Sequence, residues 1–260
     1  MVKILKEANR IISLWRDHGP GSTKIDLQLA FQEIVLPASS GDKCEIVHDT
    51  FPSFEGLMVR QGKSRDWVIG INTSIDYPPR RNFTLAHEIG HFIAHRLIRD
   101  RFECTFENLN DFENYSLEAE ANAFASQLLI PPDIVRQFDM ERVFEHEAVT
   151  ELSNLVGVSM EAAAFRWINL TTRPIGFAKS RDTMIDKGRA SAPLYSMGVW
   201  FKQGIEIPEK SLASGLTVAG EQKSASLAAG VWSANYPCRE SSYATKRDGY
   251  VYTYLDFDKL

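Results

Sequence analysis

Two histidines four residues apart, with a glutamate directly after the first, are the feature that most limits how this chain can fold. His87, Glu88 and His91 form this H-E-x-x-H pattern. On a helix each residue advances about 100°, so the two imidazoles lie roughly 40° apart and can reach one metal ion. Glu88 falls roughly 60–100° off that line, where its carboxylate can reach a metal-bound water. The pattern is typical of hydrolytic zinc sites when it lies on a helix and meets a third ligand.

The residues around the motif predict a helix from about Arg80 to Leu97. Pro78-Pro79 offers a start signal. Apolar residues then recur at three- and four-residue spacing, which marks one buried face. Ahead of the helix, residues 67–72 are rich in β-branched side chains and predict a strand, with residues 55–59 as its partner. We also expect the edge of the strand at Trp67–Asn72 to hold the backbone of a bound peptide by strand addition.

An open zinc site needs a third protein ligand, and the motif helix does not supply one. His95 lies eight residues after His87, about 12 Å along the helix, which is too far for ligand bonds of roughly 2 Å. We interpret it as a histidine of the helix face or a support for a ligand. A metzincin site would need Gly and His where this chain has Ala94 and Leu97, which excludes that class.

The third ligand is predicted on the next helix, over residues 116–129, which ends before two prolines. Glu118 would bind the metal, and Asn122, one turn later, could accept the free N–H of a ligand imidazole. Glu120 is the competing ligand, about 200° away from Glu118 around the helix. A close approach to the motif helix, near the short end of the usual range of about 8–10 Å, is predicted from five small residues. They are Ala119, Ala121, Ala123, Ala125 and Ser126.

In two segments and in their spacing, the chain resembles the ImmA/IrrE family of zinc metallopeptidases. The resemblance rests on the run Asn82–His91, on Glu118 27 positions after it, and on the segments Ala121–Ala125 and Leu128–Pro131. It covers about residues 45–135.

The resemblance implies a gluzincin-like fold with His87, His91 and Glu118 as metal ligands and Glu88 as the catalytic base. It implies Zn²⁺ as the cofactor, with Mn²⁺ or another divalent ion as the alternative. Members typically cleave a helix-turn-helix repressor of the Xre type and thereby release a stress-response, prophage or mobile-element programme. The resemblance therefore implies a metalloendopeptidase whose partner is a protein substrate.

Composition limits the other function classes. The net charge of −5 on 260 residues offers no general attraction to nucleic acid or acidic membranes. The chain also lacks an apolar leader region and any stretch of roughly 18 apolar residues that could span a membrane. Three widely spaced cysteines, Cys44, Cys104 and Cys238, fit neither a disulfide framework nor a zinc ribbon, so we expect free thiols. We expect a cytoplasmic protein that binds neither nucleic acid nor membrane directly.

The whole chain is predicted to be an α+β protein of three parts. Residues 1–135 form the metallopeptidase domain, with a first helix over residues 3–17 and a long polar loop over residues 99–113. Residues 136–172 form a helix-turn-helix-like helical unit. Residues 173–260 form a small C-terminal α+β domain, for which the family suggests a sensor-like role.

The helical unit raises two rival functions, a DNA-binding regulator and a metal-bound, non-catalytic regulator that acts through protein contacts. Residues 133–172 carry seven acidic and three basic side chains, whereas a DNA-reading module presents a basic face. An inactive scaffold would have no need of Glu88. Both observations favour the peptidase. Its second electrophile is open between Tyr115 and a residue of the C-terminal domain.

Overall fold

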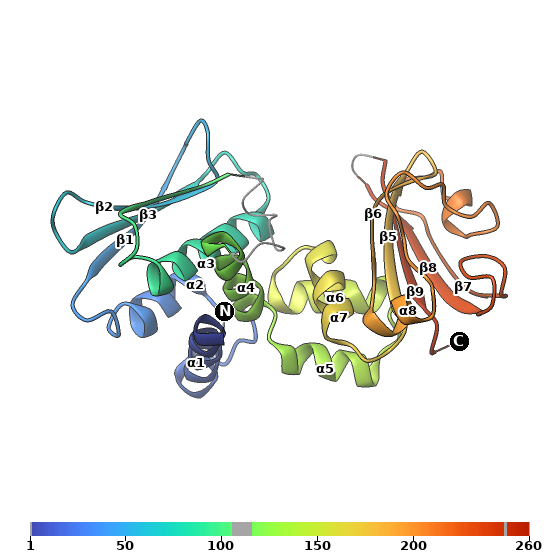
Figure 1. The fold of residues 1–260 in the computed structure, drawn as a ribbon, viewed down its shortest axis with the longest axis horizontal. Coiled ribbons are helices and arrows are strands. Elements are labelled where there is room, and N and C mark those ends of the chain that lie inside the picture. Colours follow the sequence, from blue (N-terminus) through green and yellow to red (C-terminus); the bar gives the residue numbers. More distant parts are fainter. Residues whose placement is uncertain (1, 106–115, 247–248, 260) are drawn as a thin grey trace. The chain divides into compact units, whose positions relative to one another are not determined.

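The computed structural model describes residues 2–105, 116–246 and 249–259, which form an α+β protein with two sheets (Figure 1). Two compact units divide the chain. The first holds residues 1–131 and 154–159, and the second holds residues 132–153 and 160–260. The three-part division drawn from the sequence remains a prediction. None of the helices described is long and apolar enough to cross a membrane.

The first unit contains a mixed sheet with the strand order β1-β3-β2-β4. β1 (Lys43–Asp49) runs parallel to β3 (Asp66–Asn72), and β3 runs antiparallel to β2 (Gly56–Arg60). The predicted pairing of residues 67–72 with residues 55–59 is therefore confirmed. The predicted free edge at Trp67–Asn72 is wrong, because β1 and β2 pair with β3 on both sides and leave it no open edge for a peptide.

The second antiparallel partner of β2 is β4 (Arg101–Cys104), which forms the other edge of this sheet. It lies in the segment predicted to be a polar loop, so that prediction is wrong for residues 101–104. Its residues alternate between exposed and buried, with Phe102 and Cys104 facing inward. The charged residues Arg101 and Glu103 face solvent, which explains the polar composition. Residues 106–113 of the predicted loop lie outside the described residues.

The described part of the first unit contains four α-helices, and the third of them carries the H-E-x-x-H motif. They are α1 (Val2–His18), α2 (Leu27–Ala30), α3 (Pro78–Ala94) and α4 (Leu117–Leu129). A π-helical turn, Phe31–Val35, continues α2. The apolar face of α1 is buried as predicted. The motif helix α3 ends before the predicted Leu97, and Leu97 is 82% exposed, so this leucine does not extend the buried face.

α3 packs against the sheet and against α4, which also contacts α1 (Figure 1). Gly90 of α3 permits the close approach of α3 and α4. A Cβ at this position would lie 3.1 Å from Phe124 Cδ1 and 3.3 Å from the Cα of Ala121. Of the five small residues predicted to allow this approach, Ala119, Ala121 and Ala125 are buried. Ala123 and Ser126 are only half-buried.

The described part of the second unit combines three longer α-helices and a short one with a five-stranded antiparallel sheet. The longer helices are α5 (Pro132–Glu141), α6 (His146–Val156), whose last turn belongs to the first unit, and α7 (Met160–Leu170). The sheet has the order β6-β5-β9-β8-β7. Its strands are β5 (Ile175–Arg181), β6 (Met184–Ala190), β7 (Gln222–Leu227), β8 (Cys238–Ala244) and β9 (Val251–Asp256). The short helix α8 (Ala192–Ser196) follows β6.

The second helix of the predicted helix-turn-helix serves packing within this unit. α6 and α7 are separated by a turn at Gly157, whose φ is +73°. α7 buries Ala163, Trp167 and Ile168, and its Phe165 meets Phe177 of β5 edge to face at 5.6 Å. α7 therefore uses these side chains for packing. The expectation that the chain does not bind nucleic acid remains a prediction.

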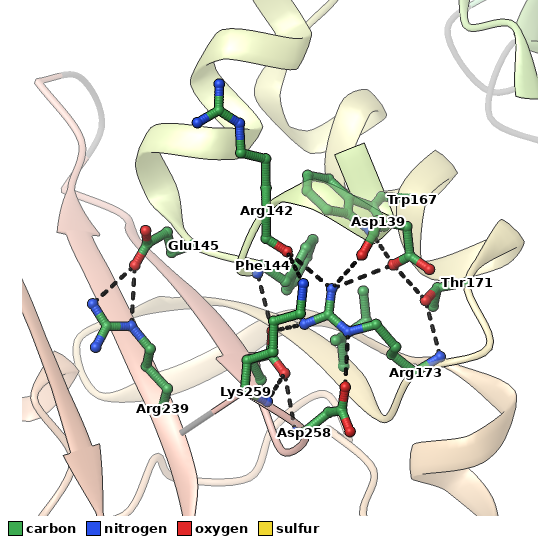
Figure 2. Close-up of polar contacts among 12 residues, drawn as sticks. Asp139, Arg142, Phe144, Glu145, Trp167, Thr171, Arg173, Arg239, Asp258 and Lys259 are labelled. Carbon is green, nitrogen blue, oxygen red and sulfur yellow. Dashed lines mark hydrogen bonds and ion pairs between the residues drawn. The ribbon is translucent and has the colours of Figure 1, made fainter. Parts of the chain in front are cut away.

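A network of polar contacts fastens α5 and α7 to the last strand (Figure 2). Asp139 Oδ1 accepts hydrogen bonds from Trp167 Nε1 and Thr171 Oγ1, both at 2.7 Å. The guanidinium of Arg173 donates to the backbone carbonyl of Asp139 at 3.0 Å and pairs with Asp256, which is fully buried. The helices and the sheet therefore share one set of charged groups, in which Asp256 is buried and Asp139 and Arg173 are half-buried.

Candidate metal centre

Three side chains on two helices converge on one point in the first unit. His87 Nε2 and His91 Nε2 lie 2.9 Å apart. Glu118 Oε2, from the first turn of α4, is 3.2 Å from the former and 3.4 Å from the latter. Both histidines are fully buried, whereas 24% of the Glu118 side chain is exposed. The structure thus brings together all three residues that the sequence nominates as ligands.

The spacing of these atoms fits a small tetrahedral cation. Zinc bonds to nitrogen and oxygen of about 2.0–2.1 Å place neighbouring ligand atoms of a tetrahedron about 3.3 Å apart. The observed separations of 2.9, 3.2 and 3.4 Å bracket that value. Three acceptor atoms this close repel one another unless a cation or a proton lies among them. The donor set of two imidazoles and one carboxylate is therefore suited to a divalent metal.

The start of α4 places Glu118 beside the histidines. Ser116 caps this helix, because its hydroxyl oxygen accepts from the backbone N–H of Ala119 at 3.1 Å. Burial alone would raise the pKa of Glu118, but its contacts with His87 and His91 outweigh burial and hold that pKa well below its usual range. Glu118 is thus a carboxylate at neutral pH and able to bind a cation.

Asn122 fixes the orientation of His87. Its Oδ1 lies 2.8 Å from His87 Nδ1, and both side chains are fully buried. The amide oxygen can only accept, so Nδ1 carries the proton and Nε2 keeps a lone pair that points at the cluster. The role that the sequence predicts for Asn122 is confirmed by this contact.

Two contacts in series fix the orientation of His91 in the same way. Its Nδ1 lies 2.9 Å from Nδ1 of His95, whose Nε2 is 3.3 Å from Glu120 Oε2. A proton on His95 Nε2 faces the carboxylate, which makes His95 Nδ1 an acceptor and His91 Nδ1 the donor. His91 Nε2 then keeps its lone pair for the cluster. Burial lowers the pKa of His91 to about 4, so its imidazole is neutral at physiological pH.

These contacts also place the competing carboxylate. Glu120 lies beside His95 and not at the cluster, whereas Glu118 faces both ligand imidazoles. His95 supports His91, which matches the reading that it cannot share the metal. Phe102 of β4 stacks on the His91 ring with centroids 4.3 Å apart and closes its other side.

Glu88 sits next to the cluster in an unusual environment. It is fully buried, and among the described residues no nitrogen or oxygen donor reaches its carboxylate oxygens, while the neighbouring Cys104 thiol interacts with it. Burial raises its pKa to about 7, although His87 and the Cys104 thiol lower it. Gly56 of β2 provides the room, since a Cβ there would lie 2.6 Å from Glu88 Oε1. A buried carboxylate without a nitrogen or oxygen donor is expected where a water or substrate completes the site.

Sequence reasoning missed Cys104 as part of this cluster. Its Sγ is 3.9 Å from Glu118 Oε2, and the four donor atoms of His87, His91, Cys104 and Glu118 lie within 4.8 Å of one another. Burial raises the pKa of its thiol, as do the nearby carboxylates of Glu88 and Glu118. The residue is a free thiol, as expected, but no ligand spacing in the sequence pointed to it.

One candidate for the second electrophile, Tyr115, lies outside the described residues. The other suggestion, a residue of the C-terminal part, concerns the second unit, and all residues of the cluster belong to the first. The four residues proposed for catalysis and metal binding therefore come from α3 and α4 alone.

In a comparison with known protein families, residues 44–167 match the model of the IrrE N-terminal-like domain of the M78 peptidases. A comparison with curated proteins gives no match. The matched segment contains every residue of the cluster as well as Glu88. Together the family and the donor set support a peptidase that holds a divalent metal. The match over residues 44–167 supports an ImmA/IrrE family metallopeptidase.

Proposed function

We propose that the protein is a zinc-dependent endopeptidase that cleaves a helix-turn-helix repressor of the Xre type and thereby induces a stress-response, prophage or mobile-element programme. The observation that carries the enzymatic part is the convergence of three acceptor atoms beside the buried carboxylate of Glu88. The choice of substrate rests on the similarity of residues 44–167 to the IrrE N-terminal-like domain. Cleavage of a transcriptional repressor would take place in the cytoplasm.

Zinc is proposed as the metal because of the chemistry of the donors. Two imidazole nitrogens and one carboxylate oxygen, with a fourth position for water, form a ligand set found in catalytic zinc sites. Ions such as Mn²⁺ and Mg²⁺ favour sites richer in oxygen and of higher coordination number. His87 and His91 would supply the nitrogens and Glu118 the oxygen.

A zinc ion held by His87, His91 and Glu118 would supply Lewis-acid chemistry, which would lower the pKa of a bound water toward about 7 and polarise the scissile carbonyl. Glu88 takes the proton from that water and delivers it to the leaving amine. Its burial suits both steps, because a pKa of about 7 lets the carboxyl accept and release a proton near neutral pH. Asn122 and His95 hold the two imidazoles in place during the reaction.

The test is cleavage of a repressor encoded beside this protein by the purified, zinc-loaded chain. We expect wild type to cut it and a chelator to stop the cutting. Glu88→Gln should keep its zinc and lose about 10²–10⁴-fold in rate, the usual contribution of a general base. Glu33→Gln, at an exposed glutamate outside the site, is the matched control and should cut normally.

Each failure of this test has its own meaning. If a folded, zinc-loaded protein cuts other peptides but not the repressor, the substrate assignment is wrong. If it cuts no peptide at all, the enzymatic proposal is wrong. A Glu88→Gln variant that cuts as fast as wild type would remove Glu88 from the mechanism.

A further inference from the structure

Cys104 is the member of the cluster that the proposed mechanism does not use. It is fully buried at the end of β4, where its Cα is paired with that of Gly56. Its sulfur lies 3.9 Å from Glu118 Oε2 and within 4.8 Å of both histidine donor atoms. A thiol at this place is more than a packing residue, because sulfur is a strong ligand for zinc.

The distances can be compared with those expected for sulfur at the fourth vertex of the tetrahedron. With a Zn–S bond of about 2.3 Å and Zn–N bonds of about 2.0–2.1 Å, sulfur would lie about 3.6 Å from each other ligand atom. The 3.9 Å separation from Glu118 exceeds this by about 0.3 Å, and the upper limit of 4.8 Å exceeds it by about 1 Å. A shift of this size lies within reach of a side-chain rotation and a small movement of β4.

A second observation indicates that this corner of the site is built to receive something. Glu88, beside Cys104, is fully buried, and within the described part of the chain no nitrogen or oxygen donor reaches either of its oxygens. Leaving such a group unsatisfied costs free energy, so a donor is expected here in the working protein. The Cys104 thiol is a neighbouring group that can donate to Glu88, and the same contact provides a path for its proton to this carboxylate.

We propose that Cys104 is a fourth, sulfur ligand of the metal in the resting protein. The inference rests on the proposed metal site. The S–H bond breaks as the sulfur–metal bond forms, and the proton passes to the neighbouring carboxylate of Glu88. The resting site is then a closed tetrahedron of two histidines, Glu118 and Cys104. A closed site has no position for the attacking water, so Cys104 must leave before a peptide is cut.

The test is the absorption spectrum of the full chain with cobalt(II) in place of zinc. Thiolate ligation adds a near-ultraviolet sulfur-to-cobalt charge-transfer band to the visible bands of a tetrahedral site. We expect this band in wild type and its complete loss in Cys104→Ala, with the visible bands retained. Cys44→Ala, at a half-buried cysteine of β1, is the control and should keep the band.

The possible outcomes separate this inference from the proposed function. Stoichiometric cobalt with visible bands but no charge-transfer band in wild type would overturn the sulfur ligand and leave the peptidase site standing. Failure to bind cobalt or zinc would overturn the proposed metal site itself. A closed resting site also predicts that zinc-loaded Cys104→Ala cuts faster than wild type, and an equal or slower rate would overturn the latency.

A measurement on the unmodified chain covers the case in which Cys104→Ala does not fold. Iodoacetamide labelling, followed by mass spectrometry of the peptides, reports each cysteine separately. A metal-bound thiolate must leave the metal before it reacts, so zinc should slow labelling of Cys104 by at least about tenfold. Labelling of Cys44 should not change with zinc. Equal rates at Cys104 with and without zinc would contradict the proposal.

Discussion

The contact between Asn122 and His87 makes the strength of metal binding testable at a residue that does not touch the metal. Asn122 Oδ1 accepts a hydrogen bond from His87 Nδ1 at 2.8 Å, and both side chains are fully buried. Asn122→Ala removes this acceptor and frees the imidazole to rotate or to adopt the other tautomer. In that tautomer the proton sits on Nε2, where it blocks the lone pair that would bind the metal.

Removing a partner of this kind typically weakens metal affinity 10–100-fold, or about 1.4–2.7 kcal/mol. The metal-free protein should also lose about 1–3 kcal/mol of stability, because the buried N–H of His87 then has no acceptor. Asn122→Asp separates orientation from packing. A carboxylate accepts the same proton and strengthens the imidazole as a ligand, so zinc affinity should stay within a few-fold of wild type or rise.

The assay is competition for zinc between each variant and a chromophoric chelator, together with urea unfolding of the metal-free proteins. Asn9→Ala serves as the control, because it removes an exposed contact between α1 and Gln127 of α4 and leaves the cluster untouched. If Asn122→Ala binds zinc as tightly as wild type, the orienting role is wrong. If Asn122→Asp loses as much affinity as Asn122→Ala, the loss comes from packing and not from the tautomer.

Three further predictions follow from other contacts. Gly56→Ala should displace Glu88, because the added Cβ would lie 2.6 Å from its Oε1, and should reduce kcat/KM about 10–100-fold while zinc binding, measured by the same competition, is retained. For Asp42, burial alone would raise the pKa, but its bonds with Arg96 and Arg65 hold that pKa below its usual value of about 4. The contribution of Asp42 to the free energy of unfolding should therefore be complete above about pH 4 and should be lost as the pH drops through its lower folded-state pKa. Asp42→Asn should remove this part of the pH dependence in urea titrations. Arg173→Met leaves the buried Asp256 without its cation and should destabilise the second unit by about 3–5 kcal/mol in urea unfolding, and unchanged stability would show that the pair contributes nothing.

The parts of the site that lie on single helices could be predicted from the sequence. His87 and His91, or Glu118 and Asn122, are four residues apart, and helix geometry alone places each pair on one face. The same periodicity predicted the buried face of α1. A hairpin such as β2 and β3 also has a local signal, because the two strands are close in the chain and joined by a polar turn. In these cases the information needed lies within about one or two dozen residues.

The errors concern pairing between distant strands. β1 joins β3 in parallel register, with Lys43 opposite Asp66, and nothing in the periodicity of either segment indicates that pairing. β4 was missed because its exposed arginine and glutamate dominate the composition of a short segment. Strand order is set by which edges remain open after the hairpin forms, so it depends on packing of the whole unit. A local reading of the sequence therefore placed a free edge on the strand that β1 covers.

The position of Cys104 in the site also depends on strand pairing that a local reading of the sequence does not predict. The sequence presents it as one of three scattered cysteines, 13 residues after His91 and 14 before Glu118, at no spacing known for a ligand. It reaches the cluster only because β4 pairs with β2 and sets Cys104 opposite Gly56, the residue whose missing side chain makes room for Glu88. One strand pairing thus places the base and the thiol in the same corner of the site. The helices determine which residues can bind a metal, and the sheet determines whether the fourth position holds water or sulfur.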